Sequence, residues 1–536
     1  MAFTSQRLAS LNTSLWIRNF VVLLIALGIF FRFYNLDYKV YWHDETMTSL
    51  RISGYTQEEM VQAAYTGDVT TVGEFLSTYQ YPNATDSLQP TMSALKQHPE
   101  HSPLYYLLAR AWMLGAPHSV AAIRLLSVFF GLLAIPCMFW LCMELFEAPL
   151  VAWVSTALFS VAPFHVLYAQ EAREYSLWTV TILLSSACCL WAMRLNKSWH
   201  WVVYGLTAAL GLYVHPFSAF VTISHGLYVL FHESWTLSRR VINYVAASLL
   251  SLLLFAPWMA VVITRFAQFT GNTASVNADR SGSMPLFWLL NLSRVFFDLN
   301  QGPSAINPAH YLLAALAIAS LIFLWRRASL SSALFITTLI GVTGLAILGP
   351  DVLLGGRRSS ITRYAIPCYL GLEIAIAYFL TMKLSERPFA VRARRRTRLR
   401  WRVVAIALAA GGIISCAVSS QVPVWWHKSY AKSRRIPDVA EVINQSDRPL
   451  VVSDRQPAGR LLSLSHTLNP DVHLQLGERA NQINVPDGFD SVYLYLPSNQ
   501  LRNRIERRQQ LVATPITLKA DEKEDWLWET DPTEQS

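Results

Sequence analysis

The sequence predicts a polytopic α-helical membrane protein with about eleven transmembrane helices, followed by a small soluble α/β domain. Of its 536 residues, 53% are hydrophobic and only 15% are charged, whereas soluble proteins carry about 25% charged residues. The mean hydropathy is +0.30. Apolar runs long enough to cross a hydrocarbon core of about 30 Å recur along roughly the first four fifths of the chain.

The expected membrane domain covers residues 1–420 and contains all the apolar segments. They lie at residues 14–34, 120–146, 150–164, 176–193, 200–214, 217–232, 241–262, 308–325, 332–349, 364–382 and 403–420. The segments at 150–164 and 200–214 are short, so they could be tilted differently or merged, and the number of crossings would then change. The first segment lacks the small-residue cleavage site of a secretory signal, so we expect it to be retained as a helix.

Basic residues predict the orientation in the membrane. With the amino terminus in the cytoplasm, alternation of the spans puts four basic connections on the cytoplasmic side. They contain Arg194 with Lys197, Arg239 with Arg240, Arg326 with Arg327, and the arginine run at 392–400. Excess Lys and Arg is typical of cytoplasmic loops. Because the arginine run is flanked by spans, we expect it to meet anionic lipid and not nucleic acid.

Four regions outside the spans are expected to face the extracytoplasmic side: the first outer loop, the stretch between the third and fourth spans, residues 264–307 and the tail. The first outer loop, residues 35–119, contains helical spacing at 57–65 and 72–79, which predicts short helices on the membrane surface. The tail, residues 421–536, alternates strand-like runs at 449–452 and 491–496 with helical runs at 437–444 and 500–510. This alternation is typical of a small α/β domain. The chain carries no eukaryotic retention signal, so we expect the bacterial cytoplasmic membrane.

The six cysteines give no sign of a disulfide framework or a zinc site, because all of them fall within predicted spans, where core packing is the ordinary role. They are Cys137, Cys142, Cys188, Cys189, Cys368 and Cys416.

The first candidate for chemistry is the carboxylate pair Asp44 and Glu45, which follows the first apolar run by about a dozen residues. Carboxylates are costly to desolvate and contribute nothing to spanning, so a pair at the membrane surface indicates either chemistry or a solvated loop. Two adjacent carboxylates alone make a poor metal site. A divalent metal therefore stays an open question, and we expect no other cofactor.

A second polar group lies at the outer end of the third span, in the segment 161–175. It contains a histidine, a glutamine, two glutamates and an arginine, and in a continuous helix Tyr168, Glu171 and Tyr175 would share one face. The alternative is a solvated collar at the membrane interface. Arg363, before the tenth span, is also expected to face outward, against the usual charge bias. A phosphate is a natural partner for such an arginine, because a guanidinium binds it bidentately.

Taken together, these motifs resemble GT-C membrane glycosyltransferases of the protein O-mannosyltransferase and aminoarabinose-transferase type, particularly the bacterial members. The matching elements are Asp44-Glu45, His98-Pro99, His101 to Tyr106, Ile123 to Ser127, Tyr168 to Tyr175 and Arg363 to Pro367, in order over residues 15 to about 385. The chain departs from the family where His101-Ser102-Pro103 replaces the usual His-Pro-Pro. The tail matches no pattern of the family.

The resemblance implies transfer of a hexose or pentose from a polyprenyl-phosphate carrier to an acceptor hydroxyl on the outer face, usually with inversion. The acceptor would belong to a protein, a glycolipid or a polysaccharide. Asp44 would be the general base, and Glu45 would orient the donor or the acceptor. Arg124, Arg173 and Arg363 would contact the departing lipid phosphate. The remaining residues of the implied donor site are Tyr168, Tyr175, Glu171, His101, Tyr105 and His165.

The main alternative is a transporter or flippase for a lipid-linked sugar. A transporter more often carries ionisable residues near the bilayer midplane, within broken helices of an inverted repeat. In this sequence the charged groups gather at the predicted outer rim, and no matching halves are visible. A membrane-anchored receptor is a weaker alternative, because displaying the tail would not require so many spans.

Overall fold

The computed structural model describes residues 15–277, 282–385, 391–454, 458–509, 511–518 and 526–532. The chain divides into two compact units. The helical unit comprises Met1–Tyr34, His98–Tyr105 and Arg124–Ser420. The mixed unit comprises Asn35–Gln97, Tyr106–Ile123 and Gln421–Ser536, so it combines most of the first outer loop with the tail.

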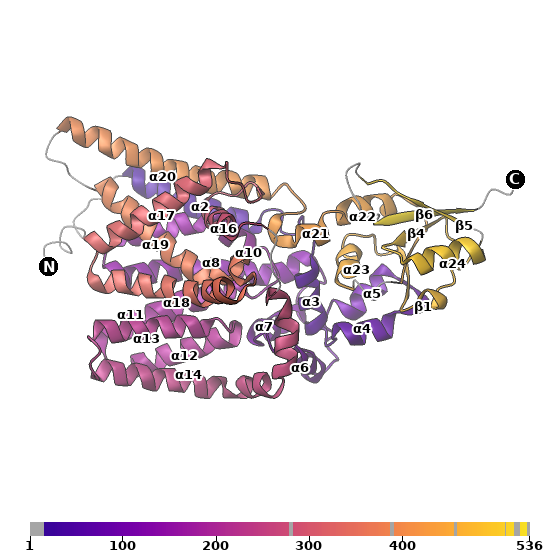
Figure 1. Cartoon of the computed structure of the whole chain (residues 1–536), viewed down its shortest axis with the longest axis horizontal. Helices are drawn as coiled ribbons and strands as arrows, with labels where there is room; N and C mark the ends of the chain where they lie inside the picture. The colour runs from indigo at the N-terminus through magenta and orange to yellow at the C-terminus, as the bar shows by residue number, and fades with distance from the viewer. Residues whose placement is uncertain are drawn as a thin grey trace. The chain divides into compact units, whose positions relative to one another are not determined.

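The helical unit is a bundle of long helices that run side by side (Figure 1). A helix occupies each of the apolar segments expected to span. These helices are α2 (Leu15–Phe33), α8 (Val120–Phe146), α9 (Pro149–Ser160), α11 (Tyr175–Leu195), α12 (Ser198–Val214), α13 (Ser218–His232), α14 (Arg239–Thr264), α17 (Pro308–Arg327), α18 (Leu330–Leu354), α19 (Ile366–Ser385) and α20 (Val391–Ser419). Shorter elements connect them: α10 (Pro163–Ala169), α15 (Phe266–Thr273), η1 (Ala274–Asn277), α16 (Met284–Phe296), η2 (Arg358–Ser360) and η3 (Thr362–Ala365).

Seven helices in the described part of the chain are long and apolar enough to cross a membrane, and there are eight crossings if α9 and α10 form one bent span. The chain is therefore a polytopic membrane protein, while the expected number of about eleven crossings stays a prediction.

The predicted span at 150–164 contains a break, because α9 ends at Ser160 and α10 begins at Pro163 after a bend of 60°. A proline has no amide hydrogen, so it suits the first turn of a new helix. Arg32 of α2 bonds to the end of α9 at this bend. Its guanidinium donates to the Ser160 carbonyl over 2.6 Å and to the Gly28 carbonyl over 2.8 Å. Gly28 admits the close approach, because a Cβ there would collide with the Ser160 backbone.

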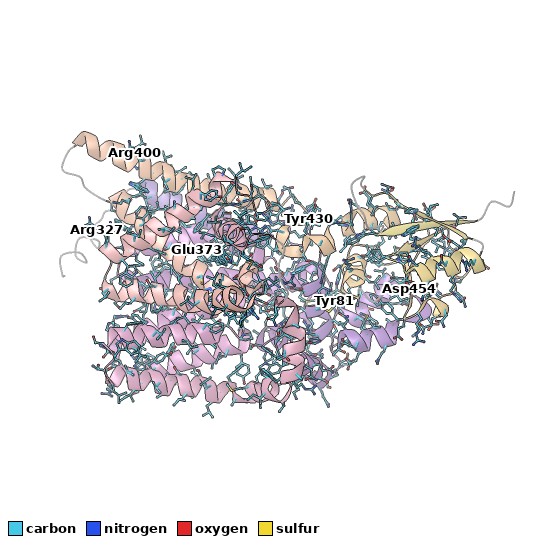
Figure 2. The ribbon with its side chains drawn as sticks, viewed as in Figure 1. Tyr81, Arg327, Glu373, Arg400, Tyr430 and Asp454 are labelled. Carbon is cyan, nitrogen blue, oxygen red and sulfur yellow. The ribbon has the colours of Figure 1, made fainter. Side chains whose placement is uncertain are left out.

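Basic residues from the predicted cytoplasmic connections gather at one end of the bundle. Arg194 pairs with Glu144 over 2.8 Å. Arg194, Arg240 and Arg327 line a single cavity, although they come from different connections. Figure 2 shows Arg327 and Arg400 near this same end. The four basic connections therefore share one end of the bundle, as the alternation of spans requires.

The mixed unit is built on a six-stranded sheet with the order β1-β3-β2-β4-β6-β5. Its strands are β1 (Thr66–Thr71), β2 (Pro449–Ser453), β3 (His473–Gly477), β4 (Ser491–Tyr495), β5 (Leu511–Pro515) and β6 (Leu527–Pro532). β2 pairs in parallel with β3 and with β4, and the outer pairs are antiparallel. The strands expected at 449–452 and 491–496 are present, whereas the other four were not predicted.

Helices cover both faces of this sheet, with α22 (Ile436–Asn444) and α23 (Ala458–Ser465) on one face and α24 (Asn499–Gln509) on the other. The other helices of the mixed unit are α3 (His43–Ile52), α4 (Gln57–Ala64), α5 (Val72–Tyr79), α6 (Leu88–Gln97), α7 (Leu104–Met113, shared between the units) and α21 (Tyr430–Ser433), with η4 (Trp426–Lys428) and η5 (Ala480–Gln482). Because side chains alternate along a strand, Val451 joins the core of α22 and α23, whereas Leu450 and Val452 join the core of α24.

The helices at 57–64 and 72–79 exist, and their apolar faces are covered by protein, while their place on the membrane surface stays a prediction. Met60 of α4 and Phe75 of α5 are buried in the same core as Ile436 and Leu462. An amphipathic pattern shows that one helix face must be covered, but not whether lipid or protein covers it.

The start of α3 is fixed by a buried ion pair. Lys428 Nζ lies 2.7 Å from Glu45 Oε2, and both side chains are completely buried. The backbone amide of Val40, just before α3, donates to the Pro423 carbonyl over 2.9 Å. The tail thus determines where the first turn of α3 lies.

The orientation can be tested with single cysteines. A cysteine at Gln268 or Asp471 should react with a membrane-impermeant maleimide in intact cells, whereas one at Thr236 should react only after lysis. All three positions are exposed, and the six native cysteines are buried, so the background should be low. Labelling of Thr236→Cys in intact cells would reverse the orientation.

Removing one partner of the buried ion pair should destabilise the mixed unit. Lys428→Met leaves the Glu45 carboxylate buried without its counter-ion, which should cost about 3–5 kcal/mol. The double variant Lys428→Met with Glu45→Gln should recover most of that loss. Lys432→Met is the control, because Lys432 is exposed. Thermal unfolding in detergent provides the measurement, and equal melting temperatures for all the variants would contradict this role of the pair.

Candidate functional site

Each unit carries one of the two groups of candidate residues. In the helical unit the group surrounds the turn Gln170–Glu174, which separates α10 from α11. Gln170 Nε2 donates to the carbonyls of Phe31 and Tyr34, both over 2.8 Å, and ties the turn to the end of α2. The segment 168–175 is thus divided by a turn and does not form one continuous helix. The turn is nevertheless rigidly held, because its polar groups bond to protein.

Two of the candidate arginines meet at one aromatic ring. The guanidinium carbon of Arg173 lies 5.7 Å from the centre of the Tyr175 ring, and that of Arg363 lies 5.5 Å from it. The Tyr168 ring packs edge-on against Tyr175 with centroids 5.1 Å apart. The negative faces of an aromatic ring attract cations, so Tyr175 stabilises two guanidinium groups that would otherwise repel each other.

The candidate arginines differ in how accessible they are. Arg173 is buried and forms an ion pair of 3.0 Å with Glu174. Arg124 of α8 is completely buried. Arg363 is half-buried. An incoming anionic group would thus reach Arg363 more readily than the other two.

The environment of this group is positive. His215, at the end of α12, stacks on Trp178 with ring centroids 4.0 Å apart. Burial, together with the charges of Arg173 and Arg363, lowers the pKa of His215 to about 3. The imidazole is therefore neutral at physiological pH, and it adds no positive charge that would need a counter-ion.

Residues that the sequence did not single out hold the segment of Arg363. Asn291 of α16 donates through its amide to the Ser360 carbonyl over 3.0 Å, and its side-chain oxygen accepts from the Thr362 hydroxyl over 2.8 Å. These bonds fix η2 and the start of η3, the short helix that carries Arg363. An asparagine in an ordinary amphipathic helix gives no signal in the sequence that could have revealed this role.

Glu373 is another residue that sequence reasoning missed. It lies inside α19, and its Oε2 is 3.0 Å from His165 Nε2 of α10, with both side chains buried. A single glutamate within a predicted span was the signal, because ionisable residues inside a membrane segment are usually paired or functional. His165 is thereby placed in a contact between helices at the bend.

Tyr105 is linked to the turn, whereas His101 belongs to another cluster. The Tyr105 hydroxyl lies 2.9 Å from Ser127 Oγ, which donates to the Arg173 carbonyl over 3.4 Å. His101 lies 3.8 Å from Glu100, which also contacts His98. Glu171 is completely buried in the turn.

In the mixed unit, Asp44 and Glu45 occupy the first turn of α3. The partial positive charge of a helix amino terminus favours a carboxylate there. Glu45 is buried against Lys428, whereas Asp44 is half-buried. Gly459 of α23 packs on His43 so closely that a Cβ would overlap the imidazole.

The described residues contain no group of three or more His, Cys, Asp or Glu side chains that could hold a metal ion. Because Lys428 already engages Glu45, the two carboxylates are not arranged as a ready metal site.

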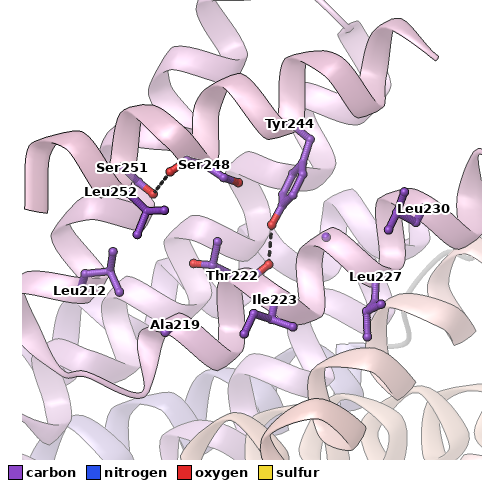
Figure 3. Close-up of a pocket in the computed structure, with 11 residues that line it drawn as sticks. Leu212, Ala219, Thr222, Ile223, Leu227, Leu230, Tyr244, Ser248, Ser251 and Leu252 are labelled. Atoms are coloured by element: carbon purple, nitrogen blue, oxygen red, sulfur yellow. Dashed lines mark hydrogen bonds between the residues drawn. The ribbon is translucent and has the colours of Figure 1, made fainter. Parts of the chain in front are cut away.

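The helical unit also has an apolar groove of about 490 Å³ between α12, α13 and α14 (Figure 3). Leu212, Ile223 and Leu252 line it, and the Tyr244 hydroxyl donates to the Thr222 carbonyl at its wall. None of its eleven lining residues is charged. The groove therefore cannot supply the acid–base groups of a reaction.

Comparison with known proteins places this geometry in a wider context. The family model of dolichyl-phosphate-mannose-protein mannosyltransferases matches residues 98–260, which is less than half of the chain. This stretch includes Tyr105 and the turn at 170–174, but neither Asp44 nor Arg363. No protein of curated function matches the chain in sequence.

Two solved structures are similar in fold. ArnT from Cupriavidus metallidurans bound to undecaprenyl phosphate has 14% sequence identity and a TM-score of 0.53, with 96% of this chain and 98% of that chain covered. The oligosaccharyltransferase of Archaeoglobus fulgidus in the apo form has 13% identity and a TM-score of 0.51, with 86% of this chain and 65% of that chain covered. The resemblance that the sequence predicts is thus confirmed, and the chain has the fold of the GT-C membrane glycosyltransferases.

Proposed function

We propose that this protein is an inverting glycosyltransferase that moves a sugar from a polyprenyl-phosphate carrier to an acceptor hydroxyl. The observation that carries the proposal is the meeting of Arg173 and Arg363 at Tyr175, because it supplies fixed positive charge for a phosphate. The candidate base, Asp44, is a half-buried carboxylate in the first turn of α3 of the mixed unit. A protein of the same fold has been solved with undecaprenyl phosphate, which supports a lipid-linked donor.

The proposed reaction is a single displacement. Asp44 takes the proton from the acceptor hydroxyl while the acceptor oxygen attacks the anomeric carbon of the sugar. The bond between that carbon and the phosphate oxygen breaks, and its electron pair leaves with the polyprenyl phosphate. The phosphate gains negative charge as the bond breaks, so the guanidinium groups stabilise the transition state more than the bound donor.

Within this scheme Glu45 has a positioning role. Its ion pair with Lys428 holds the first turn of α3 and so fixes the backbone that carries Asp44. Arg173, paired with Glu174, would likewise hold Tyr175 while Arg363 meets the phosphate. The sequence implied a more direct contact for Glu45 and Arg173, and both of those roles remain predictions.

The proposal includes the side and the compartment of the reaction. We assign the transfer to the extracytoplasmic face of a bacterial cytoplasmic membrane, because the basic connections share one end of the bundle and an excess of Lys and Arg is typical of the cytoplasmic side. The acceptor is a hydroxyl of a protein, a glycolipid or a polysaccharide. The sugar is a hexose or a pentose, since no observation distinguishes them.

The catalytic base can be tested with Asp44→Asn. The amide keeps the size of the side chain and removes its basicity, so turnover should fall by roughly 10²–10⁴-fold. The assay measures transfer of radiolabelled sugar from purified polyprenyl-phosphate sugar by the protein in detergent. Asp37→Asn is the matched control, because Asp37 is an exposed carboxylate shortly before α3.

Two outcomes of this assay would contradict the proposal. If Asp44→Asn keeps more than about a third of the activity, another group is the base. If the wild-type protein moves the lipid across vesicle membranes without consuming it, the protein is a flippase.

The phosphate contact can be tested with Arg363→Lys. Lysine keeps the charge but loses the planar, two-pronged contact, so kcat should fall by roughly tenfold or more while thermal stability changes little. Arg358→Lys is the control, because Arg358 pairs with Asp351 outside the Tyr175 group. If kcat is unchanged in Arg363→Lys, the phosphate contact must be assigned to Arg173 or Arg124 instead.

A further inference from the structure

The mixed unit has a second polar site, which the proposed transfer does not use. A cavity of about 690 Å³ lies at the carboxyl ends of the three parallel strands. Asp454 follows β2, Glu478 and Arg479 follow β3, and Ser498 follows β4 at the start of α24. Figure 2 shows Asp454 in this region of the mixed unit.

The order of the strands explains why a cavity forms there. β2 lies between β3 and β4, so the chain leaves β2 toward one side of the sheet and later returns to the other side. α23, which follows β2, packs in the core with Val451, whereas α24, which follows β4, packs in the opposite core with Leu450. Connections that diverge to opposite faces leave a crevice at the carboxyl ends of the strands, where open α/β sheets bind ligands.

The lining of the cavity carries surplus positive charge. Arg479 and Arg507 are exposed, and neither side chain forms an ion pair with any residue of the described part. Arg504 is half-buried, and it donates to the Ile483 carbonyl over 3.2 Å and to Asn484 Oδ1 over 2.9 Å. These two bonds hold its guanidinium in place.

The one buried acid of the lining does not neutralise these arginines. Asp454 Oδ1 accepts the backbone amide of Ser498 over 2.9 Å, and Oδ2 accepts the Ser498 hydroxyl. The carboxylate is thus occupied in fixing the start of α24. That helix has eleven residues, and its amino terminus adds a partial positive charge to the same cavity.

From this lining we infer that the cavity binds an anionic saccharide, either a sugar phosphate or a uronic acid. Guanidinium groups bind phosphate or carboxylate bidentately. The volume lies within the range of about 300–1,000 Å³ that is typical of small-molecule sites, and it exceeds the need of a bare anion. Gln500 and Asn503, which also line the cavity, offer amide groups to sugar hydroxyls.

Binding can be measured by isothermal titration calorimetry on the full-length protein in detergent. The probes are glucose 1-phosphate, glucuronate, uncharged glucose and inorganic phosphate. At least one charged sugar should bind more tightly than both glucose and inorganic phosphate, and the tighter of the two identifies the anionic group. Because the contacts are charged, affinity should fall as salt is raised.

The double variant Arg479→Gln with Arg507→Gln should weaken that binding by roughly tenfold or more, since two charged contacts are lost. Both side chains are exposed, so the fold should persist. Arg448→Gln is the matched control, because Arg448 is exposed at the opposite end of β2. Equal affinity in the double variant, no binding of either charged sugar, or equally tight binding of inorganic phosphate would overturn the inference. The measurement does not depend on the transfer reaction, so either proposal can fail alone.

Discussion

The turn at Gln170–Glu174 brings polar side chains into a bundle whose surroundings are apolar, and it depends on hydrogen bonds supplied by the protein itself. Lipid offers no partners to an interrupted backbone, so a break between membrane helices survives only where protein satisfies it. Arg32 bonds the carbonyl at the end of α9, and Gln170 bonds two carbonyls at the end of α2. These contacts fix the backbone of the turn and thereby the positions of Arg173 and Tyr175.

The same principle applies to α3 in the mixed unit. Its first turn carries a half-buried acid, Asp44, beside the buried Glu45, and Lys428 lies against the buried acid and compensates its charge. This charged pair fixes the backbone that carries Asp44. Precise acid–base chemistry requires that the residues around the reacting side chain hold it in one position.

Much of the helical unit could be predicted from the sequence, because long apolar runs have a simple physical meaning in a membrane. The bend after Ser160 could not, since the apolar run continues through it and only the proline at 163 marks the change. The grouping of Tyr168, Arg173 and Tyr175 followed from closeness in sequence. The approach of Arg363 to Tyr175 is a tertiary contact between distant segments, which periodicity cannot reveal.

The mixed unit was harder to predict for a different reason. Strand β1 lies in the first outer loop and pairs with β3 of the tail. In the sequence, β1 therefore looks like part of an ordinary loop. Lys428 likewise carries no local signal, because its partner Glu45 lies 383 positions earlier. The carboxylate pair itself was visible from its position after a span, but the different environments of its two members were not.

This long separation has a consequence for biosynthesis. The residues that close the sheet against β1 and neutralise Glu45 are made only after the helices of the bundle have been synthesised. Contacts so distant along the chain form late, because the entropy lost in closing the loop must be overcome first. Until the tail has emerged, α3 lacks its counter-ion and half of its support. The first turn of α3, and with it the position of Asp44, would therefore be fixed only after the tail has been made.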